Sequence, residues 1–180
     1  MIHGIINVYK EKGFTSHDVV AKLRKIAGQK KIGHTGTLDP EAEGVLPVCF
    51  GKATKLCGLL TEEDKTYEAV LLLGRTTDTQ DAAGRVLSQK SADFLTEEEV
   101  THAVLSFAGE YWQIPPMYSA LKVNGKRLYE LARKGQEVER KARRVSLYDV
   151  RVLDMSRPRV RMSVTCSRGT YIRPLSHDVG

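Results

Sequence analysis

The chain has 180 residues, of which 41% are apolar and 28% are charged, and its formal net charge is +6 at pH 7. This length and apolar content suit one domain with a sizeable core, and the mixture of charged and apolar residues excludes a disordered tail. No run approaches the ~18 consecutive apolar residues of a membrane span, and the first residues lack the features of a secretory signal.

Three cysteines are present, Cys49, Cys57 and Cys166. Their number is odd, and their spacing fits neither a zinc site nor a Cys-x-x-Cys motif. The histidines also lack the spacing typical of metal ligands. We therefore expect a cytoplasmic protein with reduced thiols, no metal ion and no membrane segment.

The net charge is distributed unevenly along the chain. Residues 1–60 carry 9 basic and 5 acidic side chains, residues 61–110 carry 4 and 11, and residues 111–180 carry 15 and 6. Clustered lysine and arginine create a positive potential, so the basic final third indicates a polyanionic partner. A solvated surface of mixed charge explains the same numbers without any partner.

The first fifty residues predict two strands, one helix and a polar loop. Residues 2–8 and residues 45–50 are apolar runs typical of short strands. Ser16 is a candidate N-cap for a helix that ends near Gly28. Residues 30–44 are rich in glycine, threonine and lysine, which indicates a loop. The apolar face of the helix comprises Val19, Val20, Leu23 and Ile26.

Further along the chain, residues 66–74 predict a strand with one apolar face. Thr96 and Glu99 form a capping box in front of a second helix. The dipeptide Asn124-Gly125 is typical of a two-residue hairpin turn. The apolar face of the predicted strand comprises Tyr67, Ala69, Leu71 and Leu73.

The last third predicts a helix over residues 127–134 that ends at Gly135, and strands over residues 144–155 and 159–166. Residues 175–180 resemble the beginning of a helix. Strands outnumber helices without strict alternation, so we predict an α+β fold with a mainly antiparallel sheet. The alternating apolar residues of the second strand are Val160, Met162, Val164 and Cys166.

Residues 30–40, KKIGHTGTLDP, form the densest cluster of side chains that can carry chemistry. Its glycines allow the backbone to approach a phosphodiester chain closely, and Asp39 would present a carboxylate to it. The alternative is structural, because Asp39 followed by Pro40 is typical of an N-cap with proline at the first helical position. His34 is likewise either a structural or a functional residue.

Three further segments allow both a functional and a structural interpretation. Tyr67 is either an aromatic residue at the edge of the core or a surface on which a nucleobase stacks. Residues 118–144 carry nine basic side chains and three glutamates, which suits a flap that closes on phosphates or an ordinary charged hairpin and helix. Arg173 either pairs with a carboxylate or lies on the surface.

Taken together, the following segments resemble the TruB family of pseudouridine synthases. The central one, KIGHTGTLDPEAEGVLPVCFGKATK, spans residues 31–55. The others are GIINVYKEKGFTSHDVV near the N-terminus, and then DKTYEA with RTTDTQDAAGRV, QIPPMYSALKVNGKRLYELARKG, and CSRGTYIRPLSHDVG. Where many members of the family have Asp-Lys-Pro, this chain has Tyr9-Lys10-Glu11, a departure in a loop that we expect to be structural.

The resemblance implies roles for residues in the matched motifs. Asp39 would be the catalytic aspartate, Tyr67 would stack on the target base, and Arg173 would pair with Asp39 to keep it ionised and oriented. His34 would lie near the flipped-out base and support the distorted loop. The other expected substrate-binding residues are Lys31, Gly36, Thr37, Lys122 and Tyr171.

The implied reaction converts uridine 55 in the T loop of tRNA to pseudouridine and requires neither a cofactor nor a metal. The carboxylate would attack carbon 1′ of the ribose, attack carbon 6 of the base, or remove the proton at carbon 2′. The expected fold is an α+β catalytic domain over residues 1–180 with a central mixed, mostly antiparallel sheet flanked by helices. Residues of about 118–144 would form a mobile basic flap.

Family members continue beyond the last matched segment and commonly carry a small PUA-like RNA-binding domain, so we expect this chain to be an incomplete catalytic domain without one. We expect a monomer that binds tRNA and no membrane. One alternative is a module that binds or folds tRNA without catalysis. Another is the guide-RNA-dependent relative that modifies ribosomal RNA, although the compact N-terminus argues against it.

Overall fold

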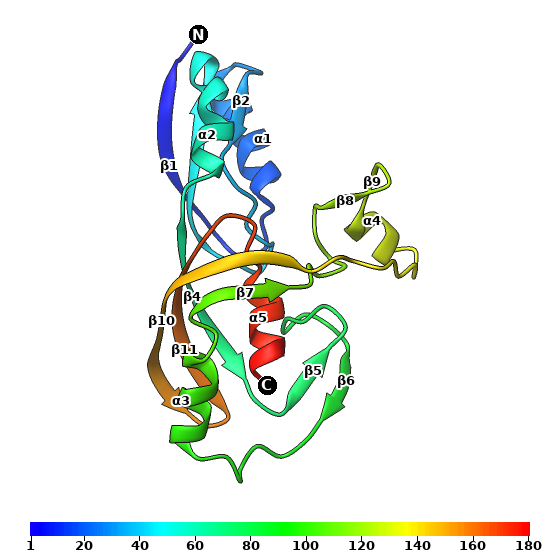
Figure 1. Cartoon of the computed structure of the whole chain (residues 1–180). Coiled ribbons are helices and arrows are strands. Elements are labelled where there is room, and N and C mark those ends of the chain that lie inside the picture. The colour runs from blue at the N-terminus through cyan, green and yellow to red at the C-terminus, as the bar shows by residue number, and fades with distance from the viewer. The chain divides into compact units, whose positions relative to one another are not determined.

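The computed structural model describes all 180 residues, Met1 to Gly180. The chain divides into two compact units, Met1–Glu63 and Asp64–Gly180, whose elements are labelled in Figure 1. The predicted α+β class is confirmed, and all the strand pairs that form are antiparallel. None of the helices is both long and apolar enough to cross a membrane.

The first unit contains a three-stranded sheet in the order β1-β3-β2. The predicted first strand is confirmed with bounds shifted by two residues, because β1 pairs with β3 from Gly4↔Phe50 to Lys10↔Gly44. The 3₁₀ helix η1 (Gly51–Leu56) and α2 (Cys57–Thr61) follow the sheet. Its strands are β1 (Gly4–Lys10), β2 (Ile32–His34) and β3 (Gly44–Phe50).

Helix α1 (Ser16–Ala27) packs its apolar face into the core of the first unit. The N-cap is Thr15 and not the predicted Ser16, because Thr15 and Asp18 complete a capping box. Gly28 ends the helix as predicted, with a left-handed φ of 61°. The core residues are Val20, Ile32, Leu46, Val48 and Phe50.

The prediction that Ile26 belongs to the apolar face is wrong, because its side chain is 78% exposed. Val20 is buried, and Leu23 and Ala27 follow it at helical spacing and pack on the same core. Ile26 lies six residues after Val20, which is about 240° around the helix, so it points away from that core.

The second unit is built on a four-stranded sheet in the order β4-β11-β10-β7. The alternation predicted for β11 is confirmed, since its four apolar residues from Val160 to Cys166 are completely buried. Tyr67, Ala69 and Leu71 lie on the buried face of β4, also as predicted. The strands are β4 (Lys65–Leu72), β7 (Gly109–Gln113), β10 (Arg143–Ser156) and β11 (Arg159–Cys166).

Two longer helices accompany this sheet. Helix α3 (Glu97–Leu105) begins at the predicted capping box of Thr96 and Glu99, and α5 (Ile172–Val179) contacts β4. The sheet and α5 share a core that contains Met162, Val164 and Leu175. A separate hairpin consists of β5 (Arg75–Thr77) and β6 (Val86–Gln89).

The basic segment predicted over about residues 118–144 contains a small hairpin and a short helix (Figure 1). The predicted turn at Asn124-Gly125 is confirmed, with φ of 51° and 79°, the left-handed values of a type I′ turn. The predicted helix is shorter than expected. The elements are β8 (Lys122–Val123), β9 (Lys126–Arg127) and α4 (Leu128–Ala132).

Candidate active site

The candidate catalytic carboxylate, Asp39, lies half-buried in the loop between β2 and β3. The backbone on each side of it is anchored. Leu38 donates its N–H to the hydroxyl of Ser16 at 2.9 Å, and the carbonyl of Pro40 accepts the N–H of Gly13 at 2.9 Å. Because Ser16 itself is buried at the start of α1, this helix and the preceding loop together set the position of Asp39.

The N-cap interpretation of Asp39 is wrong. No helix follows Pro40; instead, the carbonyl of Asp39 accepts the N–H of Ala42 at 3.0 Å and closes a single turn. Strand β3 begins at Gly44, where its register with β1 starts. The pairing of β3 therefore leaves too few residues for a helix after Asp39.

Lys10 is a second anchor of this loop, and the sequence interpretation assigned it no function of its own. Its side chain is fully buried at the end of β1. Its Nζ donates to the carbonyls of Phe14 at 2.7 Å, Glu11 at 3.0 Å and Pro40 at 3.3 Å. Burial lowers the pKa of Lys10, and the negative charge of Asp39 partly opposes this effect. Lys10 thus ties the turn after β1 to the residue that follows Asp39.

His34 ends β2 and begins the same loop. Burial lowers the pKa of its imidazole below the ordinary value of 6.5, and a backbone hydrogen bond with Gly36 partly offsets that shift. Between these residues, Thr35 is buried and accepts a hydrogen bond at 2.7 Å from the hydroxyl of Thr61. Thr37 and Lys31 are exposed. Four of the predicted residues, His34, Gly36, Thr37 and Asp39, therefore belong to one anchored loop.

Tyr67 lies in the second unit, on β4, opposite Val164 in the register with β11. It is half-buried and packs against the edge of the core. Ile172, the neighbour of Arg173 in α5, packs against the same core. An aromatic ring at the edge of a core keeps part of its surface accessible, so the structure agrees with both the structural and the stacking interpretation.

Arg173 lies in the first turn of α5, and its guanidinium joins two loops of the second unit. It donates to the carbonyl of Tyr118 at 2.8 Å and to that of Thr79 at 3.1 Å. Its Nε lies 3.9 Å from a carboxylate oxygen of Asp81. Asp81 was missed in the sequence, although its motif was recognised. Because Asp39 belongs to the other unit, the pairing of Arg173 with Asp39 stays a prediction.

The remaining two predicted residues also lie in the second unit. Tyr171 is the N-cap residue of α5, and its backbone exchanges two hydrogen bonds with the buried amide of Gln113, at 2.8 and 2.9 Å. Gln113 was not predicted, although the motif that it begins was recognised. Lys122 is exposed on β8.

The structure contains no group of three His, Cys, Asp or Glu side chains that could hold a metal ion. The three cysteines are free thiols. Cys49 is buried beside Cys57, and burial raises the pKa of the Cys49 thiol to about 11. A thiol with a raised pKa is a poor nucleophile at neutral pH, so Asp39 remains the strongest candidate for catalysis in this unit.

Comparison with solved structures finds the same fold in two structures of complexes, one of them bound to RNA. The structure described as a Cbf5-Nop10-Gar1 complex has a TM-score of 0.75 and 34% identity, covering 99% of this chain and 44% of that one. The structure described as an H/ACA RNP bound to a substrate RNA containing 2′-deoxyuridine has a TM-score of 0.71 and 30% identity, covering 99% and 42%.

Curated relatives are closer in sequence. The protein named tRNA pseudouridine synthase B in Clostridium perfringens is 52% identical over 180 residues, and that in Clostridium novyi is 54% identical over 179 residues. The alignments cover 99% of this chain but only 61% and 62% of those proteins. In addition, residues 24–172 match the N-terminal domain of the TruB family of pseudouridylate synthases. The chain therefore belongs to the TruB family.

Proposed function

We propose that this chain is the catalytic part of a tRNA pseudouridine synthase that converts uridine 55 of the T loop to pseudouridine. Its relatives named tRNA pseudouridine synthase B are 52–54% identical, whereas the proteins from the H/ACA and Cbf5 structures are 30–34% identical. This difference favours a stand-alone enzyme acting on tRNA over the guide-RNA-dependent relative.

The observation that carries this proposal is the anchoring of Asp39. The isomerisation breaks the bond between nitrogen 1 of uracil and the ribose, turns the base, and joins carbon 5 to the ribose. It needs a carboxylate in a defined place and no redox step. Ser16 and Lys10 restrain the residues before and after Asp39, so the carboxylate reaches its working position with little reorganisation. This support is the same for each of the three routes described above.

The other residues of the site complete the proposal. Tyr67 stacks on the flipped base and offsets part of the energy lost when the base leaves the loop. Arg173 pairs with Asp39 and keeps it ionised. His34, Gly36 and Thr37 contact the target nucleotide, and Lys31, Lys122 and Tyr171 contact the RNA around it.

The basic segment of residues 118–144 supports RNA binding by its charge. It closes over the T loop as a flap, with phosphate contacts that salt weakens. The chain acts as a monomer in the cytoplasm, without a cofactor. The chain spans only 61% and 62% of the length of the two curated relatives.

The test is tritium release from a tRNA transcript labelled at carbon 5 of its uridines, because the isomerisation frees that hydrogen. We expect release from the normal transcript and none from one with cytidine in place of uridine 55. Equal release from both transcripts would contradict the assignment of the target. Tight binding of tRNA without release would instead support the alternative of a tRNA-binding module.

A further inference from the structure

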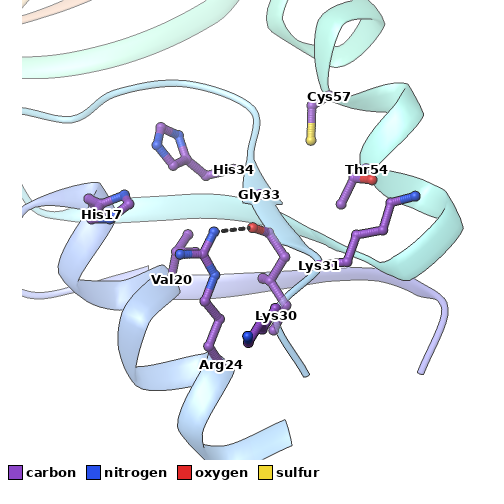
Figure 2. Close-up of a pocket in the computed structure, with 10 residues that line it drawn as sticks. His17, Val20, Arg24, Lys30, Lys31, Gly33, His34, Thr54 and Cys57 are labelled. Carbon is purple, nitrogen blue, oxygen red and sulfur yellow. Dashed lines mark hydrogen bonds between the residues drawn. The ribbon is translucent and has the colours of Figure 1, made fainter. Parts of the chain in front are cut away.

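A cavity of about 480 Å³ opens in the first unit between α1, the chain that leads into β2, and the end of η1 (Figure 2). Its volume lies within the range of about 300–1,000 Å³ typical of small-ligand sites. The residues that line it include Arg24, Lys30 and Lys31, with His17 and His34, and no carboxylate. The cavity therefore has the electrostatics of an anion site.

Arg24 is held in place at the wall of this cavity. One of its terminal nitrogens donates to the carbonyl of Ile32 at 3.0 Å, the dashed line in Figure 2. Its Nε is buried and has no hydrogen-bond partner, and neither has the buried Nδ1 of His34. Nearly all buried polar atoms in folded proteins have partners. Because Nε is out of reach, a phosphate would bind the other terminal nitrogen of this oriented guanidinium.

Gly33 keeps the cavity open. A Cβ atom at this position would already touch the Sγ of Cys57, at 3.4 Å, so a longer side chain would have to displace Cys57 or enter the cavity. Val20 and Ile32 also line the cavity, but both are almost fully buried. The groups that a ligand meets are therefore mainly the basic side chains, which suit the phosphate of a nucleotide.

We propose that this cavity is an RNA subsite, which takes the phosphate of a nucleotide next to the target uridine on Arg24 and Lys30. The inference rests on the proposed function, because it assumes an RNA loop around Asp39. His34 connects the two places: it lines the cavity and begins the loop that contains Asp39. Occupation of the subsite would hold the RNA beside this loop while the neighbouring base leaves its stack.

The first experiment measures the affinity of a T-arm stem–loop RNA for the 180-residue chain at several salt concentrations. The variant is Lys30→Gln, and the matched control is Lys25→Gln, which removes the same charge from an exposed position in α1 outside the cavity. We expect Lys30→Gln to lower the salt dependence by about one phosphate contact and to weaken binding about threefold. A loss of the same size in the control would contradict the proposal.

The second experiment identifies the phosphate. Each linkage within three nucleotides of the target uridine is replaced in turn by a neutral methylphosphonate. One linkage should weaken binding about threefold to the wild type and to Lys25→Gln, and the same replacement should cost nothing in Lys30→Gln. An Arg24→Gln variant that keeps its thermal stability should behave like Lys30→Gln. Equal penalties in Lys30→Gln and in the wild type would overturn the proposal.

Two outcomes separate this inference from the proposed function. If replacement of one linkage weakens binding only when Lys30 is present, but no tritium is released, the subsite is supported and the enzymatic assignment fails. If tritium is released while no linkage depends on Lys30, the enzymatic assignment stands and the subsite fails. Stabilisation of the wild type by inorganic phosphate or uridine monophosphate, with no sensitive linkage in the RNA, would show that the cavity takes a free ligand, which also contradicts the proposal.

Discussion

At the scale of single residues, the candidate site depends on buried polar groups that restrain Asp39. Lys10 and Ser16 are both buried, and each bonds to a residue next to Asp39. Neither could be predicted from the residues alone, because a lysine at a strand end and a serine at a helix start usually lie in solvent. Asp39 itself was recognised through its motif.

Replacement of Lys10 by methionine tests the anchor. The apolar side chain has a similar length, but it leaves three carbonyl groups without their shared donor. We expect the free energy of unfolding to fall by about 1–3 kcal/mol and turnover to fall as well, because the loop of Asp39 loosens. Urea denaturation and tritium release measure the two effects. The same substitution at the exposed Lys12 should leave both unchanged, and equal effects at the two positions would contradict the role of Lys10.

The lowered pKa of His34 predicts how the free energy of unfolding depends on pH. Burial lowers the pKa of His34 in the folded state below 6.5. Between this lowered pKa and about pH 6.5, the unfolded chain therefore binds more protons than the folded chain. The contribution of His34 to stability is therefore complete above about pH 6.5 and is lost as the pH falls through its folded-state pKa. Denaturation between pH 7.5 and 5 should show a smaller decrease for His34→Gln than for the wild type. If the exposed His102→Gln flattened the curve equally, the assignment to His34 would be wrong.

At the scale of elements, local signals predicted most of the fold. Three strong local preferences agree with the final structure. They are the capping box of α3, the turn at Asn124-Gly125 and the alternation in β11. The errors have two causes. Pro40 begins no helix because the long-range pairing of β3 with β1 starts at Gly44. The N-cap of α1 is Thr15 and not Ser16 for a local reason, the capping box that Thr15 forms with Asp18.

The cap of α1 provides a test at this scale. Thr15→Ala removes the hydroxyl that accepts the N–H of Asp18, and we expect a loss of about 0.5–2 kcal/mol in the free energy of unfolding. The hydrogen bond from Thr15 also lowers the pKa of Asp18. That pKa, followed by NMR titration, should rise toward its ordinary value in the variant. Thr15→Ser keeps the hydroxyl and should keep both properties, and a similar loss in Thr15→Ser would exclude capping as the cause.

At the scale of the whole molecule, the chain forms two units, with Asp39 in Met1–Glu63 and both Tyr67 and Arg173 in Asp64–Gly180. The order of the motifs was enough to recognise the family and the fold class. The contacts of Arg173 with Asp81, Thr79 and Tyr118 could not be predicted, because they join loops that lie far apart in the sequence.

The proposed pairing of Arg173 with Asp39 predicts that a change at Arg173 lowers turnover more than affinity for RNA. Arg173→Lys keeps the charge but not the planar fork of donors, so turnover should fall by more than tenfold, while affinity for the stem–loop RNA changes less than threefold. Arg159→Lys, at an exposed position of β11, is the matched control and should change neither. Equal losses of turnover and affinity in Arg173→Lys would indicate a role in RNA binding and not in orienting Asp39.

The role of Asp39 is tested most directly by comparing the wild type with Asp39→Asn under single-turnover conditions, with excess protein and tRNA labelled at carbon 5 of its uridines. The amide keeps the size of the side chain and removes its charge. We expect tritium release to fall at least about 100-fold while the affinity for tRNA stays within a factor of about three. Release at the rate of the wild type from Asp39→Asn would contradict the central claim that this one carboxylate drives the isomerisation.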